Sequence, residues 1–178
     1  MEEVAKIIES RKEVLFYYSP YNYIRSFDKE KQLELCVFEP ILSGIKNDDY
    51  IQVSIDGYDH FFLLSHLQWD SNYFKVDINR LDFVLYDHSN MLILQKAIKE
   101  FLLKVLTKEN VYLFINIPSE DIDLIQALGA NGFRLIETRL NYFRDDLSTY
   151  NIERYKVRAA EEKDIPNLMR VANRVEVL

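Results

Sequence analysis

The sequence predicts an α/β (α+β) fold in which helices flank a mixed, twisted sheet. Strand-like and helix-like segments alternate over residues 74–143, and this alternation favours a sheet with some parallel strands. The chain is 48% hydrophobic and has only 4 glycines and 4 prolines, a composition that can fill a core and is not typical of disorder. We expect an N-terminal domain over residues 1–150 and a second unit over residues 151–178.

The first 38 residues of the chain are predicted to contain one helix and two strands. Residues 2–11 place their apolar side chains on one face of a helix. Residues 14–18, Val-Leu-Phe-Tyr-Tyr, are β-prone and end at Ser19-Pro20. Residues 32–38 alternate apolar and polar side chains after a polar break, which predicts a strand.

A β-hairpin is predicted next. Residues 51–55 alternate apolar and polar side chains, and residues 58–65 form the return strand. Between them, Asp56-Gly57 is a favoured two-residue turn because glycine accepts positive φ.

The segment that holds the only tryptophan, residues 67–74, is predicted to be a loop or short turn. It leads into a strand over residues 75–86. The apolar alternation of that strand slips by one residue near Asn79-Arg80, so we expect a bulge or bend there.

The clearest helix spans residues 90–107, where apolar residues recur at helical spacing and charged residues occupy the opposite side. Residues 89–90 offer an N-cap. Residues 111–117, Val-Tyr-Leu-Phe-Ile-Asn-Ile, are predicted to form a buried strand. A further helix is expected to begin with Ser119 as its cap and to end at Gly129.

Two more strands and a helix complete the prediction. Asn131-Gly132 is expected to turn the chain into a long strand, Phe133–Phe143. After a polar linker, residues 155–159 are predicted to form a strand, and Asp164-Ile-Pro is expected to open a helix. A lone strand and helix bury their apolar faces only by docking, so this unit either packs on the preceding domain or belongs to a second domain that is cut short.

Charge and cysteine usage exclude several classes of protein. The net charge of −7 gives no general attraction for nucleic acid or an anionic membrane. The single cysteine, Cys36, excludes an internal disulfide. The N-terminus lacks a signal-peptide core, and no apolar run approaches the roughly 20 residues that span a bilayer. We therefore expect a cytoplasmic protein with no nucleic-acid or membrane partner.

The sequence contains no recognisable catalytic or cofactor motif. The three histidines lack zinc-ligand spacing, so they are predicted to lie in turns and at the surface rather than to bind a metal: His60, His66 and His88. Cys36 has no adjacent base, and there is no nucleophile elbow. The four glycines do not cluster, so none forms a phosphate loop; Gly44 is predicted to serve a loop.

Two groups of charged residues have alternative interpretations. Glu120, Asp121 and Asp123 fit the first turn of a helix, whose dipole favours acids, and a paired general acid and base is the weaker alternative. Three arginines on the last predicted strand fit a solvated surface better than an anion site: Arg134, Arg139 and Arg144.

Trp69, Asp70 and Phe74 are the candidate substrate-binding residues. In one interpretation they form an aromatic platform and a carboxylate at a ligand cleft. In the other, which the residue types favour, the indole is buried and Asp70 and Ser71 satisfy local backbone amides in an Asx-type turn.

The order of several motifs resembles a known enzyme family. The motifs are Leu67-x-Trp-Asp-Ser-x-x-Phe74, Leu128-Gly-x-x-Gly-Phe-x-Leu-Ile-Glu-Thr138 and Tyr155-Lys-Val-Arg-Ala-Ala-x-x-x-Asp-Ile-Pro-x-Leu168. Over residues 60–175 the chain resembles the N-terminal region of TDP-fucosamine acetyltransferase-like GNAT N-acetyltransferases, followed by the first strand and helix of a GNAT catalytic domain. The resemblance implies a GNAT-like N-terminal accessory domain.

In such enzymes the resemblance implies acetyl transfer from acetyl-CoA to an amino group, often on a nucleotide-linked amino sugar. The expected partner is a small-molecule amino acceptor, and a homodimer is one arrangement that the resemblance allows. The family's Gln/Arg-x-x-Gly-x-Gly/Ala loop, which holds the acetyl-CoA pyrophosphate, has no match here. No catalytic residue carries over, so we expect this chain to bind no acetyl-CoA and to be inactive alone. The alternative is a non-catalytic GNAT-like binding or assembly module.

Overall fold

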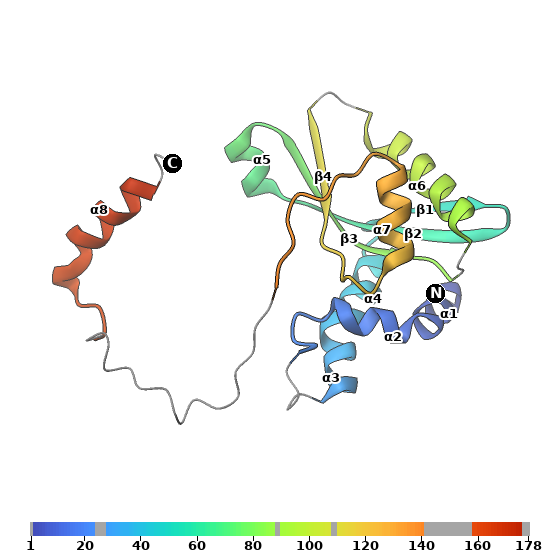
Figure 1. The fold of residues 1–178 in the computed structure, drawn as a ribbon, viewed down its shortest axis with the longest axis horizontal. Coiled ribbons are helices and arrows are strands. Elements are labelled where there is room, and N and C mark those ends of the chain that lie inside the picture. Colours follow the sequence, from blue (N-terminus) through green and yellow to red (C-terminus); the bar gives the residue numbers. More distant parts are fainter. Residues whose placement is uncertain (1, 24–27, 88–89, 108–109, 141–157, 176–178) are drawn as a thin grey trace. The chain divides into compact units, whose positions relative to one another are not determined.

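A computed structural model describes residues 2–23, 28–87, 90–107, 110–140 and 158–175 (Figure 1). The chain divides into two compact units, Met1–Asn141 and Tyr142–Leu178. No helix among the described residues is long and apolar enough to cross a lipid bilayer.

The first unit is built on a four-stranded mixed sheet with the strand order β1-β2-β3-β4. The strands are β1 (Tyr50–Ile55), β2 (Tyr58–His66), β3 (Asp77–Leu85) and β4 (Val111–Ile115). The first three are antiparallel neighbours, whereas β4 pairs parallel to β3. The helix α6 (Met91–Val105) crosses between these two parallel strands, so the predicted mixed sheet with flanking helices is confirmed.

The hairpin turn and the bulge were both predicted from the sequence. Asp56 and Gly57 join β1 to β2 with φ angles of 52° and 88°, the positive values that a two-residue hairpin turn requires. The bulge lies in β3 at Asp82, because Leu63 pairs with Phe83 and Leu64 pairs with Leu81. It therefore falls two residues beyond the predicted place near Asn79-Arg80.

The chain before β1 is helical throughout its described elements, so the two strands predicted there are wrong. Its elements are α1 (Glu2–Ser10), α2 (Lys12–Leu15), η1 (Phe16–Tyr18), α3 (Lys29–Leu33), η2 (Glu34–Phe38) and α4 (Glu39–Lys46). The segments 14–18 and 32–38 fall within these helices. The physical reason in the second case is a buried stripe at a spacing of four residues: Leu33, Val37, Ile41 and Ile45.

The sheet buries both of its faces under helices. Phe62 and Val84 belong to a core that includes Leu94 and Phe101 of α6, and the Phe62 and Phe101 rings stack at 4.2 Å between centroids. Neighbouring strand residues point to the other face, as the two-residue period of a strand requires. That face contributes Phe61, Leu63 and Leu85 to a second core with the N-terminal helices.

Gly44 lies inside α4 rather than in the predicted loop. A Cβ atom added at this glycine would stand 2.9 Å from Cδ2 of Leu63, a residue of β2 that is 3% exposed. The glycine therefore allows α4 to approach the sheet closely.

After β4 the chain forms α7 (Ile122–Ala130), and residues 133–140 follow this helix. The helix predicted from Ser119 begins later, with Asp121 at its N-cap position, and ends one residue after Gly129. Residues 133–140 form no strand, which corrects the prediction for that part of Phe133–Phe143; residues 141–143 lie outside the described residues.

The second unit contains a helix that is preceded by a capped helical turn. The turn Glu162–Asp164 leads into α8 (Ile165–Val175), and Glu161 and Asp164 form a reciprocal capping box. Arg158 donates two hydrogen bonds to Asp164, at 2.7 and 2.8 Å. Residues 158–159 form no strand, and the rest of the strand predicted over 155–159 lies outside the described residues.

Candidate functional site

A pocket lies at the carboxyl ends of the two parallel strands. Their pairing runs from Asp77 opposite Val111 to Leu81 opposite Ile115, and β3 continues beyond this point to Leu85. Tyr86 directly follows β3, and Asp121 follows the loop after β4. In open α/β sheets, ligands bind outside the carboxyl ends of the strands, so this edge is the expected place for a site.

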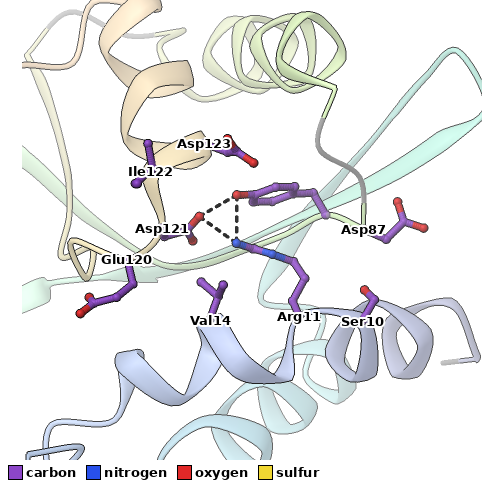
Figure 2. A pocket seen from close by; sticks show the side chains of 9 residues that line it. Ser10, Arg11, Val14, Asp87, Glu120, Asp121, Ile122 and Asp123 are labelled. Atoms are coloured by element: carbon purple, nitrogen blue, oxygen red, sulfur yellow. Dashed lines mark hydrogen bonds and ion pairs between the residues drawn. The ribbon is translucent and has the colours of Figure 1, made fainter.

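Asp121 is the centre of a buried polar network at this pocket. Its side chain is 1% exposed and forms an ion pair of 2.8 Å with Arg11, whose side chain is 10% exposed. Tyr86 donates a hydrogen bond of 2.6 Å to Oδ1 of Asp121, and Tyr18 donates one of 2.6 Å to Oδ2. Figure 2 shows the guanidinium of Arg11 pointing toward the Asp121 carboxylate.

Arg11 is itself held in place by Tyr86. Its Nη2 donates to the Tyr86 hydroxyl at 2.9 Å, and its Nη1 donates to the Val84 carbonyl at 3.4 Å. The guanidinium carbon lies 3.7 Å from the centroid of the Tyr86 ring, a cation–π geometry. Arg11 sits between α1 and α2, so these contacts fix the N-terminal helices against the end of β3.

Burial and the Asp121 carboxylate keep both tyrosines protonated. Burial raises the pKa of Tyr18 well above its ordinary value, and the negative charge of Asp121 raises it further. The pKa of Tyr86 is also raised, chiefly by burial, although the Arg11 charge opposes the shift. The two hydroxyls therefore act as hydrogen-bond donors, and neither is suited to accept a proton as a general base near neutral pH.

The structure separates the three carboxylates that the sequence groups together. Asp121 is buried, Asp123 is half-buried and Glu120 is exposed. Asp121 stands at the N-cap position of α7, but its side chain makes no capping hydrogen bond. Asp121 therefore lies at the start of a helix, as predicted, but its carboxylate holds Arg11 and the two tyrosines instead of capping that helix.

The pocket beside this network has a volume of about 390 Å³. It is lined by Ser10, Arg11, Val14, Tyr86, Asp87, Glu120, Asp121, Ile122 and Asp123. Figure 2 shows the carboxylates of Asp87, Glu120 and Asp123 placed around the Arg11–Asp121 pair. Among the lining residues that the structure describes, Arg11 is the only cation and pairs with Asp121, so the rest of that lining is negatively charged.

Trp69, Asp70 and Phe74 lie elsewhere, on α5 (Gln68–Phe74). The predicted loop is a helix, and the predicted burial of Trp69 is wrong because its side chain is 72% exposed. The Trp69 ring stacks on Tyr73 at 5.4 Å between centroids. Since α5 precedes β3 and the pocket follows it, the nine residues of β3 separate them by roughly 25 Å at the rise of a strand.

Two of the histidines differ in their surroundings. His60 is fully buried in β2, with its Nδ1 3.2 Å from the Val53 carbonyl oxygen, so its predicted place in a turn is wrong. His66 is exposed at the end of β2, as predicted, and His88 lies outside the described residues. Nε2 of His66 is 3.1 Å from Oγ of Ser71 and 3.3 Å from Oδ1 of Asp77.

The His66 contacts do not form a catalytic triad. A triad places the hydroxyl and the carboxylate on different ring nitrogens, whereas Ser71 and Asp77 both approach Nε2. The Ser71 oxygen also accepts a hydrogen bond from the Ile78 amide at 2.9 Å. Within the described ranges, no group of three or more His, Cys, Asp or Glu side chains is placed to hold a metal ion.

Arg11, Tyr18 and Tyr86 were not singled out as site residues by sequence reasoning. They come from an interhelical junction, a short helical turn and the end of a strand, and 110 residues separate Arg11 from Asp121. The one local signal was the Tyr-Asp-His triplet at residues 86–88, which marks a polar step directly after an apolar strand.

No protein family, curated protein or solved structure matches this chain.

Proposed function

We propose that the first unit is the accessory domain of a GNAT-type N-acetyltransferase and that it binds the amino acceptor. The observation that carries this proposal is the acidic pocket at the carboxyl ends of β3 and β4. The family assignment rests on the sequence resemblance over residues 60–175, and the pocket indicates the chemistry of the ligand.

The charge of the pocket favours a protonated amine. Arg11 neutralises Asp121, so Asp87, Glu120 and Asp123 supply the remaining field around the cavity. A primary ammonium has three donors and no acceptor, and an ionised carboxylate accepts hydrogen bonds but cannot donate them. The amino group of an amino sugar therefore fits this lining, whereas a phosphate group would be repelled by it.

The same charges argue against acetyl-CoA as the ligand of this pocket. The acetyl-CoA pyrophosphate needs exposed backbone amides or cations, and the sequence lacks the family's phosphate loop. In the complete enzyme that we propose, acetyl-CoA is held by the catalytic domain. An acceptor that is linked to a nucleotide would have to keep its phosphate groups outside the acidic cavity.

A non-catalytic binding or assembly module is the second candidate function. The observation that favours it is the exposed aromatic group on α5, where Trp69 is 72%, Tyr73 is 66% and Phe74 is 59% exposed. An exposed cluster of large apolar side chains is typical of a surface that another molecule covers.

Ligand-induced thermal stabilisation separates these functions. We expect glucosamine to raise the melting temperature and to do so more than glucose, which has the same ring without the ammonium, because a ligand that binds only the folded state stabilises it. Acetyl-CoA is expected to cause no comparable rise. Equal rises in melting temperature with glucosamine and with glucose would contradict the proposal that the pocket binds an amino acceptor. Strong stabilisation by acetyl-CoA would contradict the proposal that acetyl-CoA is held by the catalytic domain.

Variants that remove carboxylate charges from the pocket test whether glucosamine binds there. In Glu120→Gln/Asp123→Asn, the dissociation constant for glucosamine should rise roughly tenfold, which corresponds to 1.4 kcal/mol of lost attraction. The matched control is Glu34→Gln/Glu100→Gln, which makes the same charge change at exposed positions outside the pocket. A similar loss of affinity in the control would mean that the ligand responds only to the overall charge.

A further inference from the structure

The side chain of Asn131 joins the end of α7 to α6. Asn131 stands at the C-cap position of α7 and is half-buried. Its Nδ2 donates to the carbonyl of Ala127 in α7 at 2.9 Å and to the carbonyl of Gln95 in α6 at 3.1 Å. The Ala127 carbonyl is one of the last four of its helix, which need a partner from outside the helical repeat. Both amide hydrogens of Asn131 are thus used in tying the two helices together.

The backbone at the end of α7 requires a glycine directly after Asn131. The amide of Gly132 donates to the carbonyl of Gly129 at 3.2 Å, and the next amide donates to the carbonyl of Leu128 at 3.1 Å. These two bonds form a Schellman motif, which places its C′ residue in the left-handed region. Gly132 accordingly has a φ of 89°, which glycine adopts without steric cost. The fold therefore creates an Asn-Gly pair, and no other asparagine in the sequence is followed by glycine.

An asparagine followed by glycine can lose its side-chain amide by reaction with its own backbone. The backbone nitrogen of Gly132 attacks Cγ of Asn131 and closes a five-membered succinimide ring. The bond from Cγ to Nδ2 breaks, and Nδ2 leaves as ammonia with the proton that the attacking nitrogen gives up. One water molecule then opens the ring and leaves aspartate or isoaspartate. Glycine favours the attack because it has no side chain that would crowd the nitrogen.

The structure restrains both reacting groups. The attacking nitrogen of Gly132 is engaged with Gly129, and the leaving nitrogen of Asn131 is engaged with two carbonyls. The ring can close only after these bonds break, so the reaction requires local opening at the end of α7. Water reaches the site, because Asn131 lines a cavity of about 500 Å³ together with Leu106 and Ala130.

We propose that Asn131 is a modification site, which deamidates when the end of α7 opens and then weakens the contact between α7 and α6. The aspartate that forms has no donor for the two carbonyls. Its negative charge is also unfavourable at the C-terminal end of a helix. Lys99 lines the same cavity, but it is exposed and exposed ion pairs contribute little to stability.

Peptide mapping by mass spectrometry tests the proposal on the full chain, incubated at mildly alkaline pH in native buffer and in urea. Deamidation at Asn131 should be faster in urea on the order of tenfold or more, because the restraining bonds are absent there. Asn72 is the control in the same samples, since it is exposed and precedes Tyr73 instead of a glycine. In urea it should deamidate much more slowly than Asn131. Equal rates at Asn131 in the two solvents, or equal rates at the two asparagines in urea, would overturn the proposal.

A variant that carries the product tests the consequence. Asn131→Asp should lower the melting temperature and should speed hydrogen exchange of the α7 amides on the order of tenfold. Asn72→Asp makes the same charge change on α5, where the side-chain oxygen accepts a hydrogen bond from Gln68 and a carboxylate can still do so. Its melting temperature and α7 exchange should stay close to those of the wild type. If both variants gave the same exchange rates in α7, Asn131 would not tie this helix to α6. These measurements are independent of amine binding at the acidic pocket.

Discussion

The hydroxyl of Tyr18 donates a 2.6 Å hydrogen bond to Asp121, which lies 103 residues later in the sequence. The contact joins the helices before β1 to the start of α7, and Arg11 and Tyr86 complete the same junction. The N-terminal helices thereby supply one wall of the acidic pocket. The site and the stability of the N-terminal layer consequently depend on the same carboxylate.

Replacing Asp121 with alanine should destabilise the first unit by about 3–5 kcal/mol, the usual cost of removing one partner of a buried ion pair. The loss leaves the Arg11 guanidinium, which is 10% exposed, without its carboxylate. Urea denaturation followed by circular dichroism measures the change in the free energy of unfolding.

The matched control for this prediction is Glu120→Ala. Glu120 is the adjacent residue in the sequence and is exposed, and surface substitutions usually change stability by less than about 0.5 kcal/mol. If Asp121→Ala and Glu120→Ala proved equally mild, the buried network would not stabilise the fold.

Alkaline pH should weaken the fold through Tyr18 and Tyr86. The pKa of each is raised above the ordinary value of 10.0, so above pH 10 the unfolded chain releases protons that the folded chain retains. The stability from these groups is therefore fully present below pH 10 and is lost as the pH rises beyond it.

The measurement is the urea midpoint as a function of pH from neutrality to the alkaline range. Tyr18→Phe should lower stability at neutral pH by about 1.5–3 kcal/mol, the worth of a hydrogen bond to a charged group, and should make the alkaline decline shallower. Tyr73→Phe, at an exposed tyrosine outside the network, is the control. An unchanged alkaline slope in Tyr18→Phe would show that other groups cause the decline.

The exposure of Trp69 predicts that its removal has little effect on stability. Trp69→Ala should change the free energy of unfolding by less than about 0.5 kcal/mol, as is usual for surface positions. Phe62→Ala should cost about 3–5 kcal/mol, because Phe62 is fully buried and stacks on Phe101. Chemical denaturation compares the two directly, and a large loss in Trp69→Ala would mean that the indole is covered in solution.

The elements predicted correctly are those whose signals are local. The hairpin follows from alternation on both sides of Asp56-Gly57, and α6 follows from a long helical repeat with Asn90 as its cap, which accepts a hydrogen bond of 3.1 Å from the Leu92 amide. Both signals are complete within about 20 residues, so tertiary contacts were not needed to interpret them.

The sequence predictions were wrong where a segment fits both the period of a strand and the period of a helix. They were also wrong where residues distant in the sequence decide whether a side chain is buried. Residues 33, 35 and 37 alternate like a strand, but the longer stripe that continues to Ile41 and Ile45 is helical and is the one that the core buries. The amphipathic indole of Trp69 carries no local sign of its exposure. Asp121 fits a helix start in sequence, and only the fold brings Arg11 to it.

Two glycines with opposite backbone requirements provide the last prediction. Gly57 adopts a φ of 88° in the hairpin turn, a region that costs other residues roughly 1–2 kcal/mol, so Gly57→Ala should lower stability by about that amount. Gly129 lies in α7 with open space around an added Cβ, and alanine is favoured over glycine in a helix by about 1 kcal/mol. Gly129→Ala should therefore raise the melting temperature while Gly57→Ala lowers it. Differential scanning calorimetry distinguishes the two signs, and equal shifts in the same direction would contradict the assigned turn.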